Sequence, residues 1–184
     1  MELSSEKLEE LDKIFTRQTL LQNAGIYILE NELTIRDWVE ISSSKNLSDD
    51  FIMEFQDQLQ WFVVSQNQNL SEEFIRKYKD KVAWDYISYH QKLSENFIRE
   101  FQDRVEWYSI TKVQHLSDNF IIEFREKINF ELYFIYQEAS FLIMKKFILK
   151  TSHRNTKEFK TSHLTDIQRK EIEKILSLKY TFKN

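Results

Sequence analysis

Apolar and polar positions along this chain follow a pattern that repeats every 23 residues. Each copy opens with Leu-Ser, continues through two acidic or amide residues, and then carries Phe-Ile. A large aromatic residue follows fourteen positions after the leucine. The aromatic residues of the four clear copies are Trp61, Trp84, Trp107 and Phe130. A fixed period of this length is typical of repeat proteins, in which neighbouring units bury a continuous core.

The first half of each copy predicts a short helix that begins at the serine. Serine is a preferred N-cap because its hydroxyl accepts a hydrogen bond from a free backbone N–H of the first turn. The acidic residues that follow favour the positive end of the helix dipole. We therefore expect helices to begin at Ser48, Ser71, Ser94 and Ser117.

The second half of each copy predicts another short helix, which carries the aromatic residue. An acidic column precedes this helix, and we interpret it as the N-cap. The column consists of Asp57, Asp80, Asp103 and Glu126. Isolated helices of about two turns are marginal in water, so stacking between copies must stabilise them. We expect the tryptophans to form an aromatic spine between successive copies.

A glutamine closes each second helix before the next Leu-Ser. We expect its amide to bridge backbone groups at the corners between copies. The column consists of Gln68, Gln91, Gln114 and Gln137.

Both ends of the chain depart from the pattern, which predicts three regions. Residues 1–23 predict an N-terminal capping helix, and residues 139–184 predict a degenerate repeat followed by a basic C-terminal cap. Between them lies the repeat array of residues 24–138, with copies at 24–46, 47–69, 70–92, 93–115 and 116–138. Thr165 and Gln168 have the capping-box spacing and predict the start of a last helix. The expected fold is all-α, a short right-handed-type α-solenoid of two-helix repeats with a capping helix at each end.

Composition favours helices over the main alternative. The chain has no proline and one glycine, Gly25, whereas sheet proteins with tight turns usually need both residue types. Residues 82–87 have strand-like composition, and leucine-rich repeats have a similar period, so a β/α horseshoe is the alternative. The leucines do not occupy the offsets that this alternative requires, and the capping columns favour helices.

Charge is unevenly distributed along the chain. The net charge is −4 over residues 1–46, −7 over residues 47–138 and +7 over residues 139–184. There is no cysteine, the N-terminus does not have the pattern of a secretory signal, and no apolar stretch approaches the roughly twenty residues that span a bilayer. We expect a cytoplasmic protein that does not contact membranes, located in the host cytoplasm if the protein is viral.

The sequence favours binding over catalysis. It has no glycine-rich phosphate loop, no HExxH and no paired CxxC, so we expect no enzymatic activity, no cofactor and no metal. Tyrosine is enriched at interface hot spots, and Tyr86, Tyr89 and Tyr108 lie around the second helix at positions that vary between copies. The alternative is that these side chains complete the core.

The densest basic stretch is the second candidate for partner binding. It comprises Lys145, Lys146, Lys150, Arg154, Lys157 and Lys160. These residues could meet phosphates or an acidic protein surface, or they could keep the terminal cap soluble.

The recurring Leu-Ser-Glu-Glu-Phe-Ile … Asp-x-Val-x-Trp-x-x-Ile-Ser-x-x-x-Gln resembles a tandem repeat in proteins of phages, giant viruses and low-GC bacteria whose functions are not established. The resemblance covers roughly residues 38–138 and carries no catalytic residue. The expected function is a non-catalytic protein-binding module, a phage- or virus-encoded inhibitor of a host defence complex, similar to an anti-CRISPR. Its partner would be a host defence or nucleic-acid-binding protein. The alternative is a nucleic-acid-binding adaptor that uses the basic C-terminal segment.

Overall fold

The computed structural model describes residues 4–43, 47–152 and 157–181. Over these residues the secondary structure consists of α-helices and short 3-10 helices, without a β-strand. The all-α fold class is therefore confirmed, and the β/α horseshoe is wrong. The chain forms two compact units, residues 1–91 (unit 1) and residues 92–184 (unit 2).

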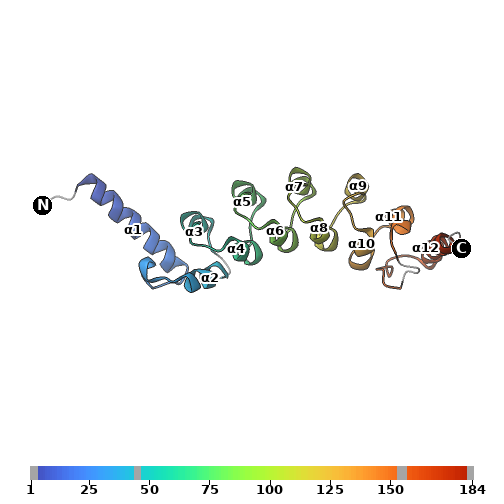
Figure 1. Cartoon of the computed structure of the whole chain (residues 1–184), viewed down its shortest axis with the longest axis horizontal. Helices are drawn as coiled ribbons and strands as arrows, with labels where there is room; N and C mark the ends of the chain where they lie inside the picture. The colour runs from blue at the N-terminus through green and yellow to red at the C-terminus, as the bar shows by residue number, and fades with distance from the viewer. Residues whose placement is uncertain (1–3, 44–46, 153–156, 182–184) are drawn as a thin grey trace. The chain divides into compact units, whose positions relative to one another are not determined.

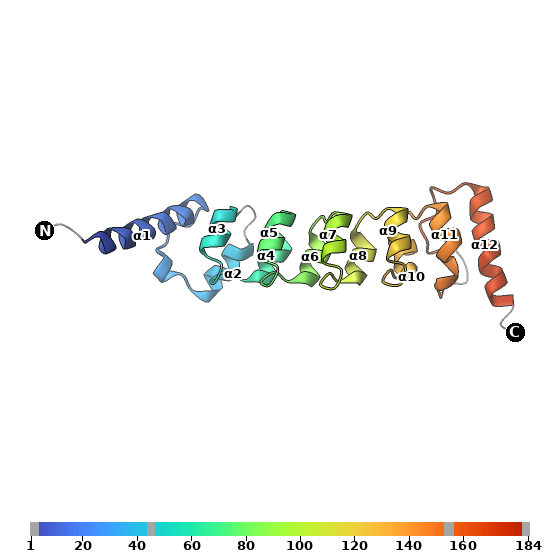
Figure 2. The same cartoon turned by 90° about the horizontal axis from the view of Figure 1, so that it is seen from above.

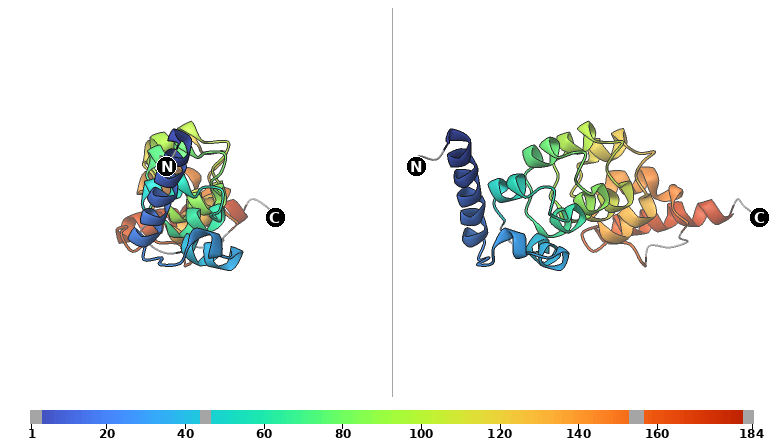
Figure 3. Two further views of the ribbon diagram at one scale, coloured as in Figure 1. Left: turned by 90° about the vertical axis from the view of Figure 1, so that its left-hand side faces the viewer. Right: turned by 60° about the vertical axis from the view of Figure 1, so that its left-hand side comes forward.

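Unit 1 begins with a long helix and continues through short helices that alternate between two rows. Its elements are α1 (Ser5–Asn23), η1 (Glu30–Glu32), α2 (Ile35–Ser43), α3 (Asp49–Glu54), α4 (Trp61–Asn67), α5 (Glu72–Lys77) and α6 (Trp84–His90). One row holds α3 and α5, and the other holds α2, α4 and α6 (Figure 1). Within the second row α4 packs against both α2 and α6, while α1 lies beside α3 at one end of the unit (Figure 3).

Unit 2 also consists of short helices that alternate between two rows, and it ends in a longer helix. Its elements are α7 (Glu95–Glu100), α8 (Trp107–Val113), α9 (Asp118–Glu123), α10 (Phe130–Tyr136), α11 (Phe141–Phe147), η2 (Ile148–Lys150) and α12 (Asp166–Thr181). One row holds α7, α9 and α11, and the other holds α8 and α10, which pack together (Figure 1). The last helix, α12, lies alongside α11 (Figure 2).

The Leu-Ser motif begins each first helix, as predicted. Ser48 Oγ accepts a hydrogen bond from Phe51 N at 3.1 Å, and the three later motifs repeat this bond. The phenylalanine and isoleucine after each cap are buried. The predicted capping box is also present, because Thr165 N donates to Gln168 Oε1 and Gln168 N donates to Thr165 Oγ1.

The acidic column does not cap the second helix, and that prediction is wrong. Each second helix of the clear copies begins at the aromatic residue itself. The acidic side chains lie in the preceding turn, and three of them form ion pairs with a lysine 24 residues further along. The pairs are Asp57–Lys81 at 2.9 Å, Asp103–Lys127 at 3.2 Å and Glu126–Lys150 at 3.2 Å. The column therefore joins successive copies.

The tryptophan column links helices both within a copy and between copies. Trp61 Nε1 donates to Gln56 O at 2.8 Å, which closes the turn before its own helix. Its ring centroid lies 5.2 Å from that of Tyr78 in the next copy. Trp107 makes the same two contacts in unit 2, with its ring 5.1 Å from Phe124. The predicted aromatic spine is confirmed within each unit.

Buried glutamines connect the backbone of successive copies. Gln91 Oε1 accepts from Leu70 N at 3.1 Å, and Gln91 Nε2 donates to the carbonyl oxygens of Ser65 at 2.9 Å and Gln68 at 2.8 Å. Equivalent bonds join Gln68 to Leu47 N and Ser42 O, and Gln114 to Leu93 N. Because these amides are buried, they satisfy backbone groups that water does not reach. The predicted bridging role of the glutamines is confirmed.

A buried serine in unit 1 supplies a second bridge. Ser65 Oγ donates to Trp61 O at 2.7 Å within its own helix and accepts from Ala83 N at 3.0 Å. Ala83 immediately precedes α6, which has no side-chain cap. Ser42 makes the corresponding bond to Gln60 N before α4. These two serines therefore link α2 to the start of α4, and α4 to the start of α6.

The N-terminal helix, α1, ends just before the single glycine, and one arginine on α1 forms ion pairs with neighbouring elements. Gly25 has φ 80°, a conformation that favours glycine, and Gly25 N and Ile26 N donate to the last carbonyls of α1. Arg17 forms ion pairs with Glu30 and Glu54. The contacts of Arg17 therefore hold α1 against η1 and α3.

Replacing Gln91 with alanine should lower the free energy of unfolding by about 2–3 kcal/mol, because Leu70 N and two carbonyls would lose a buried partner. Urea denaturation of the full chain measures this loss. The matched control is Gln66→Ala, because Gln66 is an exposed glutamine on α4. This substitution should change the free energy of unfolding by less than about 0.5 kcal/mol. Equal effects of the two substitutions would contradict the structural role of Gln91.

Candidate binding surface

The second helices of unit 1 carry exposed aromatic side chains. Phe62 on α4 is 49% exposed and Tyr89 on α6 is 44% exposed. Tyr86 is half-buried, with its ring 6.3 Å from Phe62 and 6.0 Å from His90. His90 in turn meets Tyr89 edge-on at 4.9 Å. The predicted residues Tyr86 and Tyr89 thus belong to one aromatic cluster on α4 and α6.

The second helices of unit 2 carry a related cluster around a lysine. Tyr108 on α8 is 51% exposed, and Tyr136 on α10 is also exposed. Lys112 Nζ lies 6.0 Å from the ring centroid of Tyr108 and 4.7 Å from that of Tyr136. Such distances allow cation–π attraction to both rings. Tyr108, Lys112 and Tyr136 therefore form one exposed surface on α8 and α10.

The alternative that the variable apolar side chains of the second helices complete the core holds for only some of them. Val63 and Tyr133 are buried, whereas Phe62, Tyr89 and Tyr108 are exposed. The helix begins at the tryptophan, so its second and sixth positions face outwards and its fourth faces inwards.

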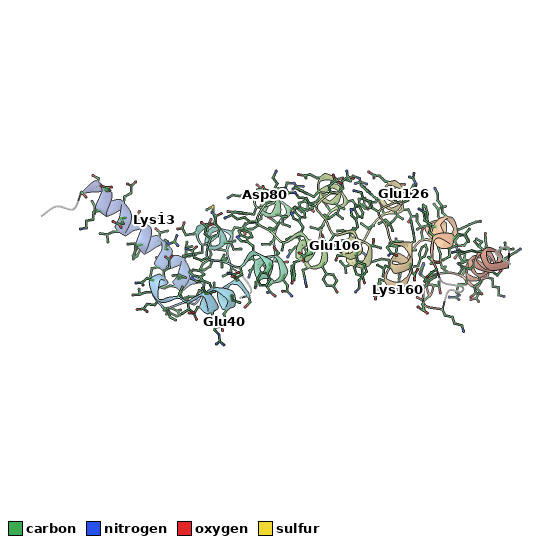
Figure 4. The ribbon with its side chains drawn as sticks, viewed as in Figure 1. Lys13, Glu40, Asp80, Glu106, Glu126 and Lys160 are labelled. Carbon is green, nitrogen blue, oxygen red and sulfur yellow. The ribbon has the colours of Figure 1, made fainter. Side chains whose placement is uncertain are left out.

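A pocket of about 760 Å³ adjoins the cluster of unit 2. Its wall includes Lys112, His115, Tyr133, Tyr136, Glu138 and Lys160. Lys160 reaches this wall because its backbone N donates to Phe134 O at 2.7 Å, and the ring of Phe159 lies 5.5 Å from that of Phe134. The segment before α12 is thereby held beside α10, where Figure 4 shows Lys160.

Tyr133 is the buried polar side chain of this pocket. It is 4% exposed and occupies the helix position that is aliphatic in the other copies. Burial, with a smaller contribution from the charge of Asp118, raises the pKa of Tyr133 to about 12. The hydroxyl therefore stays protonated at neutral pH and can act as a hydrogen-bond donor.

Among the predicted basic residues that the structure describes, Lys146 and Lys150 both lie near the ring of Phe147, whereas Lys145 and Lys160 have other neighbours. Lys145 pairs with Glu171 at 2.6 Å and Lys150 pairs with Glu126, whose position is labelled in Figure 4. Lys146 Nζ lies 5.7 Å from the ring of Phe147. Lys160 lines the pocket, Lys157 is exposed, and Arg154 lies outside the described residues.

Unit 1 has a second exposed apolar surface, on α1. Leu8, Leu11, Ile14 and Phe15 are all exposed, and Leu21 is the buried residue of this helix. The sequence pattern predicted an amphipathic helix and assigned its apolar face to capping. Instead, the contact with the rest of unit 1 is made near the C-terminal end of α1, around Arg17 and Leu21.

In the part of the chain that the structure describes, no group of three or more metal-ligating side chains is placed to hold an ion. Within the same residues, no helix combines the length and apolar character needed to cross a bilayer.

Comparison of the chain with protein-family models, curated proteins and solved structures finds no match. The fold alone therefore defines the class, an all-α helical-repeat protein.

Two residues of the candidate surface were missed by sequence reasoning. Lys112 stands in the same column as Tyr89, one copy later, and this shared position was the available signal. Tyr136 occupies the last position of α10, which the repeat pattern leaves variable. Nothing in the linear order indicates that Lys160 lies next to either residue.

Tyr133 should make stability depend on alkaline pH. Its pKa of about 12 in the folded chain exceeds the value of about 10 for an unfolded tyrosine, so its contribution is complete below pH 10 and is lost as the pH rises towards 12. Urea unfolding at pH 9 and pH 11.5 should show a larger loss for the wild type than for Tyr133→Phe. Tyr108→Phe, which removes an exposed hydroxyl, should behave like the wild type. Equal losses in all three proteins would contradict the assignment.

Proposed function

We propose that this chain is a non-catalytic protein-binding module that contacts its partner through exposed aromatic side chains of its second helices. The observation that carries the proposal is the exposure of Phe62, Tyr89 and Tyr108, which range from 44% to 51%. Aromatic side chains lose little conformational entropy on binding relative to the area they bury, and tyrosine is enriched among interface hot spots.

The division of work among the repeat positions supports this proposal. Glutamine, serine and tryptophan columns are engaged in hydrogen bonds that connect or close the copies. The second and sixth positions of the second helix belong to none of these columns, and aromatic rings occupy three of these positions in α4, α6 and α8, namely Phe62, Tyr89 and Tyr108. Helical-repeat proteins commonly bind partners through surface positions that can vary without disturbing the stacking.

The charges of the units suit a protein partner with patches of both signs. Unit 1 carries 9 Lys and Arg against 17 Asp and Glu, and unit 2 carries 17 against 13. Unit 1 would therefore favour a basic partner surface and unit 2 an acidic one. The narrower identity, a phage- or virus-encoded inhibitor of a host defence complex, stays a prediction from the sequence.

Binding of nucleic acid through the basic C-terminal segment is less well supported. Lys145 and Lys150 are paired with carboxylates, which reduces the positive charge available to phosphates. A protein partner remains the better match to the exposed tyrosines.

Capture from a bacterial lysate tests the proposal. The immobilised wild-type chain should retain a protein identifiable by mass spectrometry, and Tyr89→Ala or Tyr108→Ala should weaken its affinity about 30-fold, as expected for loss of a hot spot worth about 2 kcal/mol. Lys170→Ala, an exposed change on α12, is the control and should leave the affinity unchanged. Titration calorimetry with the purified partner measures the affinities of the wild type and the three variants.

Two results would contradict the proposal. The first is a partner held equally well by the wild type and both tyrosine variants. The second is retention of nucleic acid alone, with fluorescence anisotropy of generic duplex DNA showing tight binding that weakens steeply as salt rises.

A further inference from the structure

The pocket beside Lys112 lies where the repeat pattern of unit 2 breaks. At the fourth and fifth positions of the second helix, α8 carries Ile110 and Thr111, and α10 carries Tyr133 and Phe134. The two larger rings occupy positions that hold an aliphatic and a hydroxyl side chain in the earlier copies. The break is therefore a local change in the packing between α8 and α10.

The bridging hydrogen bonds change at the same place. In three earlier copies the N–H of the motif leucine donates to a glutamine Oε1 at 3.1 to 3.2 Å. The corresponding glutamine, Gln137, instead donates through Nε2 to Lys112 O at 2.6 Å. Among the described residues Leu116 N has no acceptor, and Thr111 Oγ1 is buried without a partner. Leu116 thus differs from Leu47, Leu70 and Leu93, whose N–H groups have a glutamine acceptor.

The pocket contains a second hydrogen-bond donor. Tyr133 is 4% exposed and lines the pocket. Its hydroxyl oxygen is not among the fully buried side-chain atoms without a partner in the described residues, so the hydroxyl is accessible from the pocket. Because α10 holds its ring, this donor is fixed in place before any ligand arrives.

The charged side chains of the pocket favour an anion. Lys112 and Lys160 lie on its wall with His115, against one carboxylate, Glu138. The pocket volume lies in the range of small-molecule sites. A hydrogen bond to an ionised acceptor is about twice as strong as a hydrogen bond between two neutral groups. An anion would therefore be attracted by the two lysines and would accept hydrogen bonds from the Tyr133 hydroxyl and the Leu116 amide.

We propose that this pocket binds a small molecule through one anionic group, a carboxylate or a phosphate. The group lies between Lys112 and Lys160 and accepts hydrogen bonds from the Tyr133 hydroxyl and the Leu116 amide. Its oxygen takes the place that glutamine Oε1 occupies in the earlier copies. The proposed site shares Lys112 with the protein-binding surface, but the proposal rests on the pocket, the broken hydrogen-bond pattern and Tyr133, and not on binding of a protein.

Titration calorimetry of the full chain at low ionic strength tests this site, with inorganic phosphate and citrate as separate probes. One of them should bind saturably, with a dissociation constant of about a millimolar or below. Tyr133→Phe and Lys160→Met should each weaken binding about tenfold, the loss expected for one charge-assisted hydrogen bond. Glu138→Gln should tighten binding because it removes a like charge.

Lys170→Met on α12 is the matched control, since it removes an exposed lysine outside the pocket. Urea midpoints of all variants separate loss of binding from loss of folding, and Lys160 is exposed, so its replacement leaves the fold intact. Tighter binding of phosphate would assign a phosphate ligand, and tighter binding of citrate would assign a carboxylate. Absence of saturable binding by both probes, or equal weakening by Lys170→Met and Lys160→Met, overturns the proposal.

Discussion

The structure depends on side chains that satisfy the backbone of neighbouring copies. A helix leaves four N–H and four C=O groups without an internal partner, so in a helix of six or seven residues most of the backbone is unsatisfied at one end or the other. Serine caps supply one acceptor for each first helix. The buried glutamines then join the backbone of one copy to that of the previous copy. Without these amides the corners would bury unpaired polar groups.

This requirement explains which positions recur and which vary. The aromatic ring at the start of the second helix closes the preceding turn and packs on the next copy. The acidic and lysine columns connect the same copies at the surface, where exposed ion pairs contribute little to stability. Positions outside these columns are not needed for stacking between copies. The exposed tyrosines and Lys112 lie at such positions.

The two candidate sites of unit 2 differ in physical character. The exposed surface of Tyr108, Lys112 and Tyr136 is broad and aromatic, which suits a protein partner. The neighbouring pocket is polar and has fixed donors, which suits a small anion. Lys112 contributes to both, because its stem lies on α8 while its ammonium group lies near Tyr136 and the pocket. Occupancy of one site would therefore alter the electrostatics of the other.

The sequence alone determined the period, the first helices and the bridging role of the glutamines. These features depend on local capping chemistry or on a column repeated several times, and both are visible in linear order. The tertiary structure decided the rest. Asp57 resembled a helix cap, but its partner, Lys81, lies in the next copy. Lys160 belonged to a basic run, yet the bond between its backbone N and Phe134 O carries it to Tyr133. Both outcomes depend on contacts between residues more than twenty positions apart, which local propensity does not encode.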